Sequence, residues 1–180
     1  MRLLLGTCVA LLGMMGSALA ADPLKLDAEK STVEFVGKKT DGSHSGGFKK
    51  FTVNAEADWE DPSKSKMEIV IDTTSIWSDD AKLTDHLKNP DFFDVRKYPE
   101  IKFESTKIEP ISETKANITG KLTMLGKTAE VVVPCEVAPS DTQLDLTAKF
   151  EIDRTQWGMN YGVGKINKEV GITVKFVFKR

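Results

Sequence analysis

The chain has 180 residues, a formal net charge of −2 and a sequence pI of about 5.8, with 40% hydrophobic and 29% charged residues. This length suits one domain and leaves little room for two. The ordinary charged fraction and the 8% aromatic content exclude a wholly disordered chain. A nucleic-acid-binding protein would need a basic stripe to neutralise phosphates, and the sequence contains none. We therefore expect a folded domain without a nucleic-acid partner.

Residues 1–20 have the features of a cleaved export signal. Arg2 precedes an apolar run that reaches Met15, and Ala18-Leu19-Ala20 supplies the small-x-small pattern that signal peptidase accepts. The run is too short for a comfortable membrane span, and no second apolar stretch of about 20 residues follows it. The sequence predicts a signal peptide over 1–20 and a single exported domain over 21–180.

Cysteine and histidine are scarce in the predicted mature chain. Cys135 is its only thiol, so an intramolecular disulfide is excluded. This thiol lies in the apolar run 131–135, where a buried, inert side chain is expected rather than a nucleophile. His44 and His86 are too few for a metal cluster, and we expect neither a metal nor a prosthetic cofactor.

Alternation of apolar and polar residues with period two dominates the mature chain. Short polar turns join the alternating segments, which is typical of an antiparallel sandwich or barrel. Long strands with one apolar face favour a closed barrel of about eight strands, whose interior is either a solid core or the site of an apolar ligand. The eight expected strands cover 33–36, 51–58, 67–74, 101–105, 116–124, 129–137, 144–152 and 170–178.

One segment has helical signals. Asp79 or Asp80 can cap a helix that runs through Leu87 and ends at Asn89-Pro90. Two adjacent aromatic residues, Phe92-Phe93, then lie in a connection, where exposed rings would gain nothing. We expect this segment to be a lid over one end of the barrel, with Phe93 buried as its anchor and Phe92 in contact with a ligand.

Two polar groups allow a functional and a structural interpretation. Asp85-His86 near Asp91 and Asp94 could form a metal site or a general base, but one histidine with scattered carboxylates falls short of a zinc pattern, which favours capping and solvation. Alternatively, His86 could hydrogen-bond the polar end of a ligand. The segment 42–47 with Lys49-Lys50 could cradle a phosphate, although a flexible hairpin loop explains the same composition.

Residues 85–106, which read DHLKNPDFFDVRKYPEIKFEST, resemble the central motif of the YceI-like proteins. Further segments that resemble the family in the same order are 26–35, 46–51, 71–76, 120–128 and 152–159. The resemblance implies an all-β fold, an extended antiparallel eight-stranded lipocalin-like barrel with one short helix between strands. It also implies an exported, periplasmic protein that holds a polyisoprenoid or a similar long apolar chain, with secretion as the alternative location.

Within this resemblance, strand parity selects the residues that line the interior, and a bulge near Lys49-Lys50 would change some of them. The expected ligand-binding residues are Phe35, Phe51, Ile69, Ile71, Leu83, His86, Leu87, Phe92, Phe93, Phe103, Ile118, Leu122, Phe150 and Phe176. Arg154 and Trp157 start a connection after the strand that ends at Ile152, and we expect them to close the base of the barrel.

The sequence thus favours a binding or carrier protein for a polyisoprenoid, an isoprenoid quinone or a fatty-acid-like lipid, without catalysis. Its expected partners are the lipid and, transiently, a membrane, and its expected state is a monomer or a homodimer. Two alternatives stay open. An enzyme acting on a lipid-like substrate would have only His86 and Arg154 as candidate groups, and a structural barrel would have a filled core.

Overall fold

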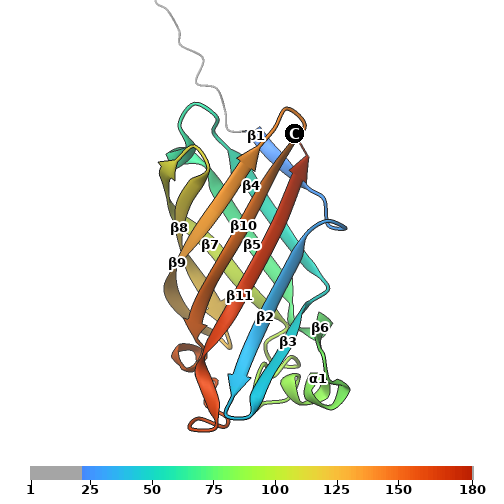
Figure 1. The fold of residues 1–180 in the computed structure, drawn as a ribbon. Helices are drawn as coiled ribbons and strands as arrows, with labels where there is room; N and C mark the ends of the chain where they lie inside the picture. Colours follow the sequence, from blue (N-terminus) through green and yellow to red (C-terminus); the bar gives the residue numbers. More distant parts are fainter. Residues whose placement is uncertain (1–21, 180) are drawn as a thin grey trace, which may run out of the picture.

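The structure, a computed structural model, describes residues 22–179, so the predicted signal peptide over 1–20 lies outside the described residues. The chain forms an elongated barrel of antiparallel strands with both described ends of the chain at one end, here called the upper end (Figure 1). The opposite, lower end carries helix α1 (Ala81–Leu87), the one α-helix of the described residues.

The described residues form eleven strands and three short 3₁₀ segments. The strands are β1 (Asp22–Leu26), β2 (Thr32–Lys39), β3 (Gly42–Phe48), β4 (Phe51–Ala57), β5 (Lys66–Asp72), β6 (Ile76–Ser78), β7 (Glu100–Ser112), β8 (Lys115–Met124), β9 (Lys127–Pro139), β10 (Gln143–Asp153) and β11 (Ile166–Lys179). The 3₁₀ segments are η1 (Pro62–Lys64), η2 (Thr73–Ser75) and η3 (Arg154–Trp157).

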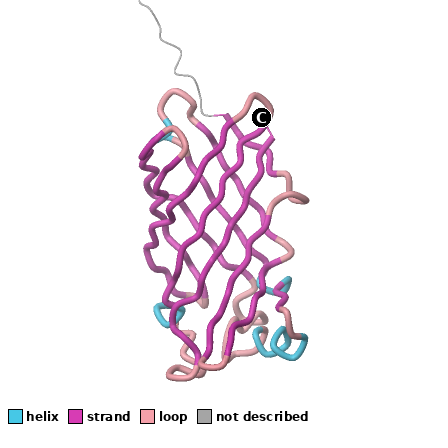
Figure 2. The backbone as a smooth tube through the Cα atoms, viewed as in Figure 1, coloured by secondary structure: helices cyan, strands magenta, loops and turns pink. Residues whose placement is uncertain are grey.

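These eleven strands fill eight positions around the barrel. The sheet order β1-β4-β5-β7-β8-β9-β10-β11 closes on itself because β1 pairs with β11 as well as with β4. Towards the lower end, β2 takes the place of β1 beside β11, and β3 and β6 continue from β2. Figure 2 shows strands over most of the barrel wall and the helical turns at its periphery. The predicted eight-stranded antiparallel barrel with one short helix is therefore confirmed.

The interruption between β3 and β4 is the irregularity expected at Lys49-Lys50. Phe48 is buried against the ring of Phe35, and Phe51 packs on Phe176, with 5.8 Å between the ring centroids. Residues three apart in an unbroken strand would face opposite sides of the sheet. The break at Lys49-Lys50 lets both rings face the interior.

The flexible hairpin loop favoured for 42–47 is wrong, because β3 pairs with β2 along its whole length. Gly46 and Gly47 are buried, and a Cβ on Gly46 would overlap the ring of Phe35 and the backbone of Trp77. The glycines therefore serve close packing rather than flexibility. Their backbone takes part in a sheet and is not arranged as an open anion cradle.

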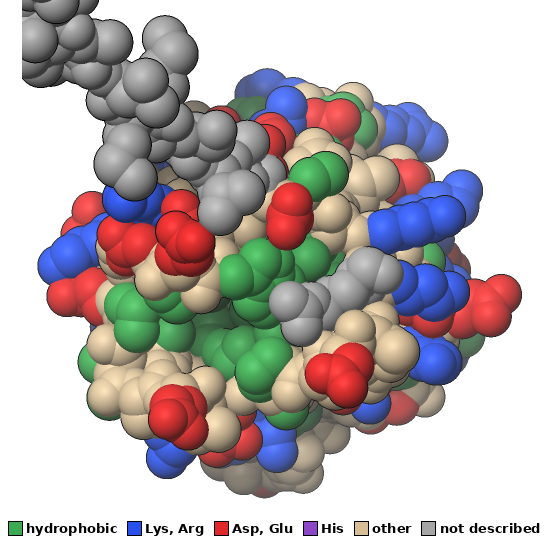
Figure 3. All heavy atoms as spheres, turned by 90° about the horizontal axis from the view of Figure 1, so that it is seen from above, with side chains coloured by type: hydrophobic (Ala, Val, Ile, Leu, Met, Phe, Trp, Pro, Cys, Tyr) green, Lys and Arg blue, Asp and Glu red, His purple; other side chains and the backbone are tan. Residues whose placement is uncertain are grey.

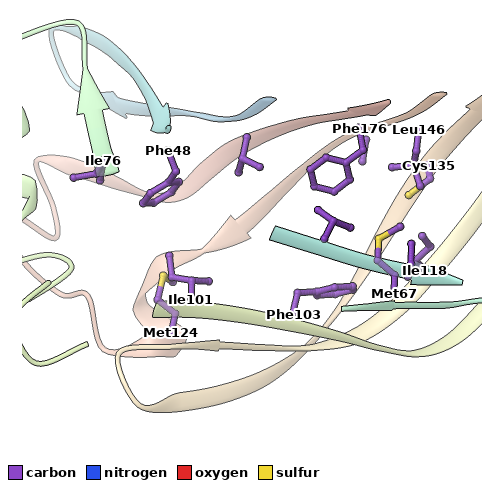
Figure 4. Close-up of a cluster of buried hydrophobic side chains, with 14 of the residues drawn as sticks. Phe48, Met67, Ile76, Ile101, Phe103, Ile118, Met124, Cys135, Leu146 and Phe176 are labelled. Atoms are coloured by element: carbon purple, nitrogen blue, oxygen red, sulfur yellow. The ribbon is translucent and has the colours of Figure 1, made fainter. Parts of the chain in front are cut away.

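The upper part of the barrel is a packed core. Phe176 and Phe178 are 1% and 0% exposed, and their ring centroids lie 6.1 Å apart. Figure 4 shows Phe176 among side chains from several strands, including Met67, Leu146 and Cys135. Viewed from the upper end, apolar side chains lie in a central hollow bordered by charged groups (Figure 3). The fully buried rings close the barrel beneath that surface.

We predict that Gly120→Ala lowers the free energy of unfolding by about 2 kcal/mol, the usual cost of overpacking a core position. A Cβ at this position on β8 would overlap the ring of Phe103, which lies across the strand, and a backbone carbonyl of Glu104. Thermal or urea unfolding measures the change. Gly37→Ala is the matched control, because a Cβ there would meet no atom within 4 Å. Equal stability of the two variants would contradict the close packing of Phe103 on Gly120.

Candidate functional site: the apolar cavity

A cavity occupies the barrel from the lower end up to the level of Phe176. Its volume is about 200 Å³, measured as the space that the centres of water molecules can occupy. Apart from Glu34 and Arg154, the side chains that border it are apolar. Such a lining offers burial to hydrocarbon and almost no hydrogen-bonding partner to a polar molecule. Its chemistry suits an apolar ligand.

All but three of the sequence-predicted ligand residues border this cavity. The residues that do are Phe35, Ile69, Ile71, Leu87, Phe92, Phe93, Phe103, Ile118, Leu122, Phe150 and Phe176. They come from β2, β5, β7, β8, β10, β11 and the lid region, so alternation along separate strands brings them together at one interior surface. Contact with a ligand stays a prediction for each of them.

Phe51, Leu83 and His86 do not border the cavity, and this corrects the sequence-based selection. Phe51 lies beyond the break in the β3–β4 strand and packs on Phe176 in the filled part of the barrel. Leu83 is half-buried on α1 and packs on the core from outside the cavity. His86 faces the lid and the surface, where its ring pairs with Asp91.

Several lining residues were not selected from the sequence. Phe48 and Met67 border the cavity, as do Ile172 and Val174 on β11. The alternation in β11 was sufficient to find Ile172 and Val174, since they share the face of Phe176. No sequence signal identifies Phe48, because its inward direction depends on the break at Lys49-Lys50.

The lid region consists of α1 and the turns that follow it. The Asp80 carboxylate accepts a hydrogen bond from the Leu83 N–H (2.7 Å), which confirms the predicted N-cap. After the helix ends at Leu87, the Phe93 N–H donates to the Leu87 carbonyl (3.0 Å). This reversal folds Phe92 and Phe93 back beneath the barrel, where both border the cavity.

The burial of the two phenylalanines is the reverse of the expected order. Phe92 is 6% exposed and lies between the rings of His86 and Tyr161, at centroid distances of 5.0 and 5.2 Å. Phe93 is only half-buried and meets Phe48 edge to face at 5.6 Å. Phe92 is therefore the anchor of the lid, because it is enclosed by an aromatic cluster that the sequence places far from it.

His86 takes part in an ion-pair geometry rather than in a metal site. Its Nε2 lies 2.9 Å from Oδ2 of Asp91, and its ring stands edge to face against Tyr161 at 4.9 Å. No further acidic side chain joins this pair, and within residues 22–179 no group of three or more His, Cys, Asp or Glu could hold a metal ion. The pair lies within the lid region, and the ring contact of His86 with Tyr161 joins the lid to the β10–β11 connection.

Arg154 and Trp157 close the lower end of the barrel, as predicted. Arg154 is 3% exposed, and its guanidinium donates to the carbonyls of Met159 (2.7 Å), Asn167 (3.0 Å) and Ile166 (3.4 Å). Burial lowers the pKa of this guanidinium, yet an arginine keeps its charge in proteins. Trp157 is 1% exposed, and its indole N–H donates to the Leu122 carbonyl on β8 (2.9 Å).

Cys135 lies on the cavity wall with 4% of its surface exposed. Burial raises the pKa of its thiol to about 12. The thiolate, which is the nucleophilic form, is therefore almost absent at neutral pH. The expected buried position of this residue is confirmed.

Among the described helices, none has the length and apolar character needed to cross a membrane.

A closed antiparallel barrel around an apolar cavity defines a class of proteins that enclose hydrophobic ligands. Comparison with known proteins assigns the family: the YceI-like domain matches residues 24–178, and the chain belongs to this family. A UPF0312 protein of Pseudomonas putida (strain GB-1) is 40% identical over 119 residues, which are 64% of this chain and 62% of that relative. The chain thus spans less than two thirds of the length of that relative.

Two solved structures share the fold. The crystal structure of Burkholderia cenocepacia BcnA has a TM-score of 0.80 and 30% identity, and the match covers 85% of this chain and 99% of BcnA. A domain from Saccharophagus degradans, described as polyisoprenoid binding and implicated in plant cell wall breakdown, has a TM-score of 0.70 and 14% identity. That match covers 88% of this chain and 98% of the domain, and at this identity it shows the fold alone.

We predict that Trp157→Ala lowers the free energy of unfolding by about 3 kcal/mol, because it deletes a fully buried ring. Trp157→Phe should cost less, since it keeps most of the packing and loses the hydrogen bond to Leu122. Chemical unfolding of both variants measures the difference. A near-normal stability of Trp157→Ala would show that the lower closure does not depend on this ring.

The lid predicts an asymmetry between Phe92→Ala and Phe93→Ala. Removal of the enclosed Phe92 ring should lower stability by about 3 kcal/mol, while Phe93→Ala should cost clearly less because its ring is half-buried. Thermal unfolding of delipidated protein tests this order. The reverse order would restore the sequence-based assignment of the two rings.

Proposed function

We propose that this protein is an exported, periplasmic carrier that holds one long apolar chain, such as a polyisoprenoid, an isoprenoid quinone or a fatty-acid-like lipid, inside its barrel. The observation that carries the proposal is the apolar cavity inside the barrel. The Saccharophagus degradans domain of the same fold, described as polyisoprenoid binding, supports this ligand class. Export rests on the signal-like features of 1–20.

The energetics of such a cavity favour exchange over permanent storage. Burial of one five-carbon isoprene unit is worth about 4 kcal/mol relative to water. A bilayer offers the same chain an equally apolar environment, so burial alone gives the barrel no advantage over a membrane. The difference in affinity between the barrel and the bilayer therefore depends on how well the chain fits the cavity. A small difference allows the barrel to return the chain to a membrane.

Binding without catalysis is the activity that the geometry supports. His86 and Arg154 are the polar groups that an enzyme hypothesis would use, but they do not meet in the cavity. His86 pairs with Asp91 outside the lining, and three carbonyls engage the Arg154 guanidinium. Transient membrane contact and a monomeric or homodimeric state belong to the same proposal.

Native mass spectrometry of gently purified mature protein tests the carrier function. We expect the folded protein to carry an added apolar mass of one chain per monomer, and organic extraction should release it for identification. Protein recovered without any such mass from several expression hosts, and unable to take up an added polyisoprenoid, would contradict the proposal. Chemical change of the added lipid would instead favour an enzyme.

A further inference from the structure

The wall of the barrel is not paired all the way round. The ladder between β9 and β10 runs from Leu144↔Pro139 to Ala148↔Cys135 and ends there. Both strands continue towards the lower end, β9 to Lys127 and β10 to Asp153. Over that stretch β9 stays paired with β8 and β10 with β11, but β9 and β10 do not pair with each other. We call this unpaired stretch of the wall the seam.

Pro134 explains why the ladder ends where it does. Leu125-Gly126, both with positive φ, form a two-residue hairpin turn, so Met124 and Lys127 are a hydrogen-bonded pair of β8 and β9. Such pairs alternate along an antiparallel ladder, and the backbone groups of Pro134 therefore point away from β8, towards β10. The register would place Pro134 opposite Lys149, but proline has no N–H to donate.

The seam adjoins the cavity on the inside and a hollow on the outside. Val131 and Val133 on β9, and Phe150 and Ile152 on β10, border the cavity along both edges of the seam, and all four are only half-buried. A separate hollow on the outer surface includes Pro134, Lys149, the exposed Ile111 and part of Cys135. Cys135 borders both spaces, so at the top of the seam a single wall residue separates the outer hollow from the cavity.

Buried side chains occupy both ends of the barrel. Phe176 and Phe178 fill the upper part, and Trp157 with the anchored Phe92 closes the lower end. Entry past these rings would require them to leave their packing, which is unfavourable. At the seam, no ladder hydrogen bond has to break. The unpaired part of β10, 149–153, is about 17 Å long at the usual rise per residue.

We propose that the seam between β9 and β10 is a lateral entrance, through which an apolar chain slides sideways into the cavity. The inference rests on the carrier function proposed above and adds its route. The outer hollow, with Lys149 and Lys115 among its residues, then receives the polar end of the chain while the hydrocarbon lies inside. An entrance in the wall lets a long molecule bind along its length, without threading through a closed end.

A cross-link over the seam tests the entrance. In the double variant Val132→Cys/Glu151→Cys, the two cysteines lie on opposite edges of the seam, at exposed positions that the register would pair. They are joined with a short bis-maleimide, to which the buried Cys135 thiol is inert. Uptake of cis-parinaric acid, a fluorescent apolar chain, is followed before and after the reaction. We expect the rate of uptake to fall at least tenfold.

The matched control is Lys107→Cys/Thr119→Cys, joined by the same reagent. These residues are already paired on β7 and β8, so their cross-link closes no opening, and uptake should keep its rate. Equal rates of uptake in the two cross-linked proteins would overturn the lateral entrance while leaving the carrier function intact. Failure of the unmodified protein to bind cis-parinaric acid, geranylgeraniol or octaprenyl phosphate would overturn the carrier function, and the entrance with it.

Pro134→Val provides a second test that needs no chemical reagent. Valine restores an N–H that faces Lys149, so the ladder can extend into the seam and uptake should slow several-fold. Amide hydrogen exchange at Val132 and Glu151 should slow in the same variant. Pro139→Val is the control, because Pro139 lies in the part of β9 that is already paired with β10. Unchanged uptake in Pro134→Val, despite slowed exchange at Val132, would contradict the proposal.

Discussion

The closed ring of backbone hydrogen bonds is the constraint on which the rest of this structure depends. A sheet that closes on itself pairs its strands without help from the interior, because the ladder bonds lie within the wall. Here the pairing of β1 with both β4 and β11 completes the ring. The wall is therefore stabilised partly independently of how the interior is packed. This allows the lower part of the barrel to enclose a cavity while the upper part has a filled core.

Two breaks in the strands lie next to the cavity and the lid. At Lys49-Lys50 the break changes which side of the strand faces inward and places Phe48 at the cavity. Between β5 and β6 the chain turns through η2, and after β6 it supplies the helix and the aromatic lid. Each interruption removes a few ladder bonds, and in exchange it directs side chains that a regular barrel would place elsewhere.

Glycine and aromatic residues work together in the wall. The ring of Phe35 lies over Gly46, and the ring of Phe103 lies over Gly120, so that a side chain on either glycine would collide with its neighbour. Each ring is thereby held against the wall at a cross-strand position. This arrangement lets large apolar side chains line the cavity of a protein that has no disulfide within its described residues.

The sequence by itself determined the eight longer alternating strands, the barrel class and the family, because period-two alternation is a local consequence of the pleated strand and the motif over 85–106 is long. It also limited the helix cap to Asp79 or Asp80, of which the structure uses Asp80, and it determined most of the lining, since residues such as Ile69 and Phe103 follow strand parity. Only the tertiary structure decided the direction of Phe48 and which of Phe92 and Phe93 is the more deeply buried ring. Those depend on a strand break and on Tyr161, which is distant in sequence and close in space. The strand at 42–48 was not predicted for a related reason. Its glycines are typical of a loop in the local sequence, and only the tertiary structure shows that neighbouring side chains pack directly on them.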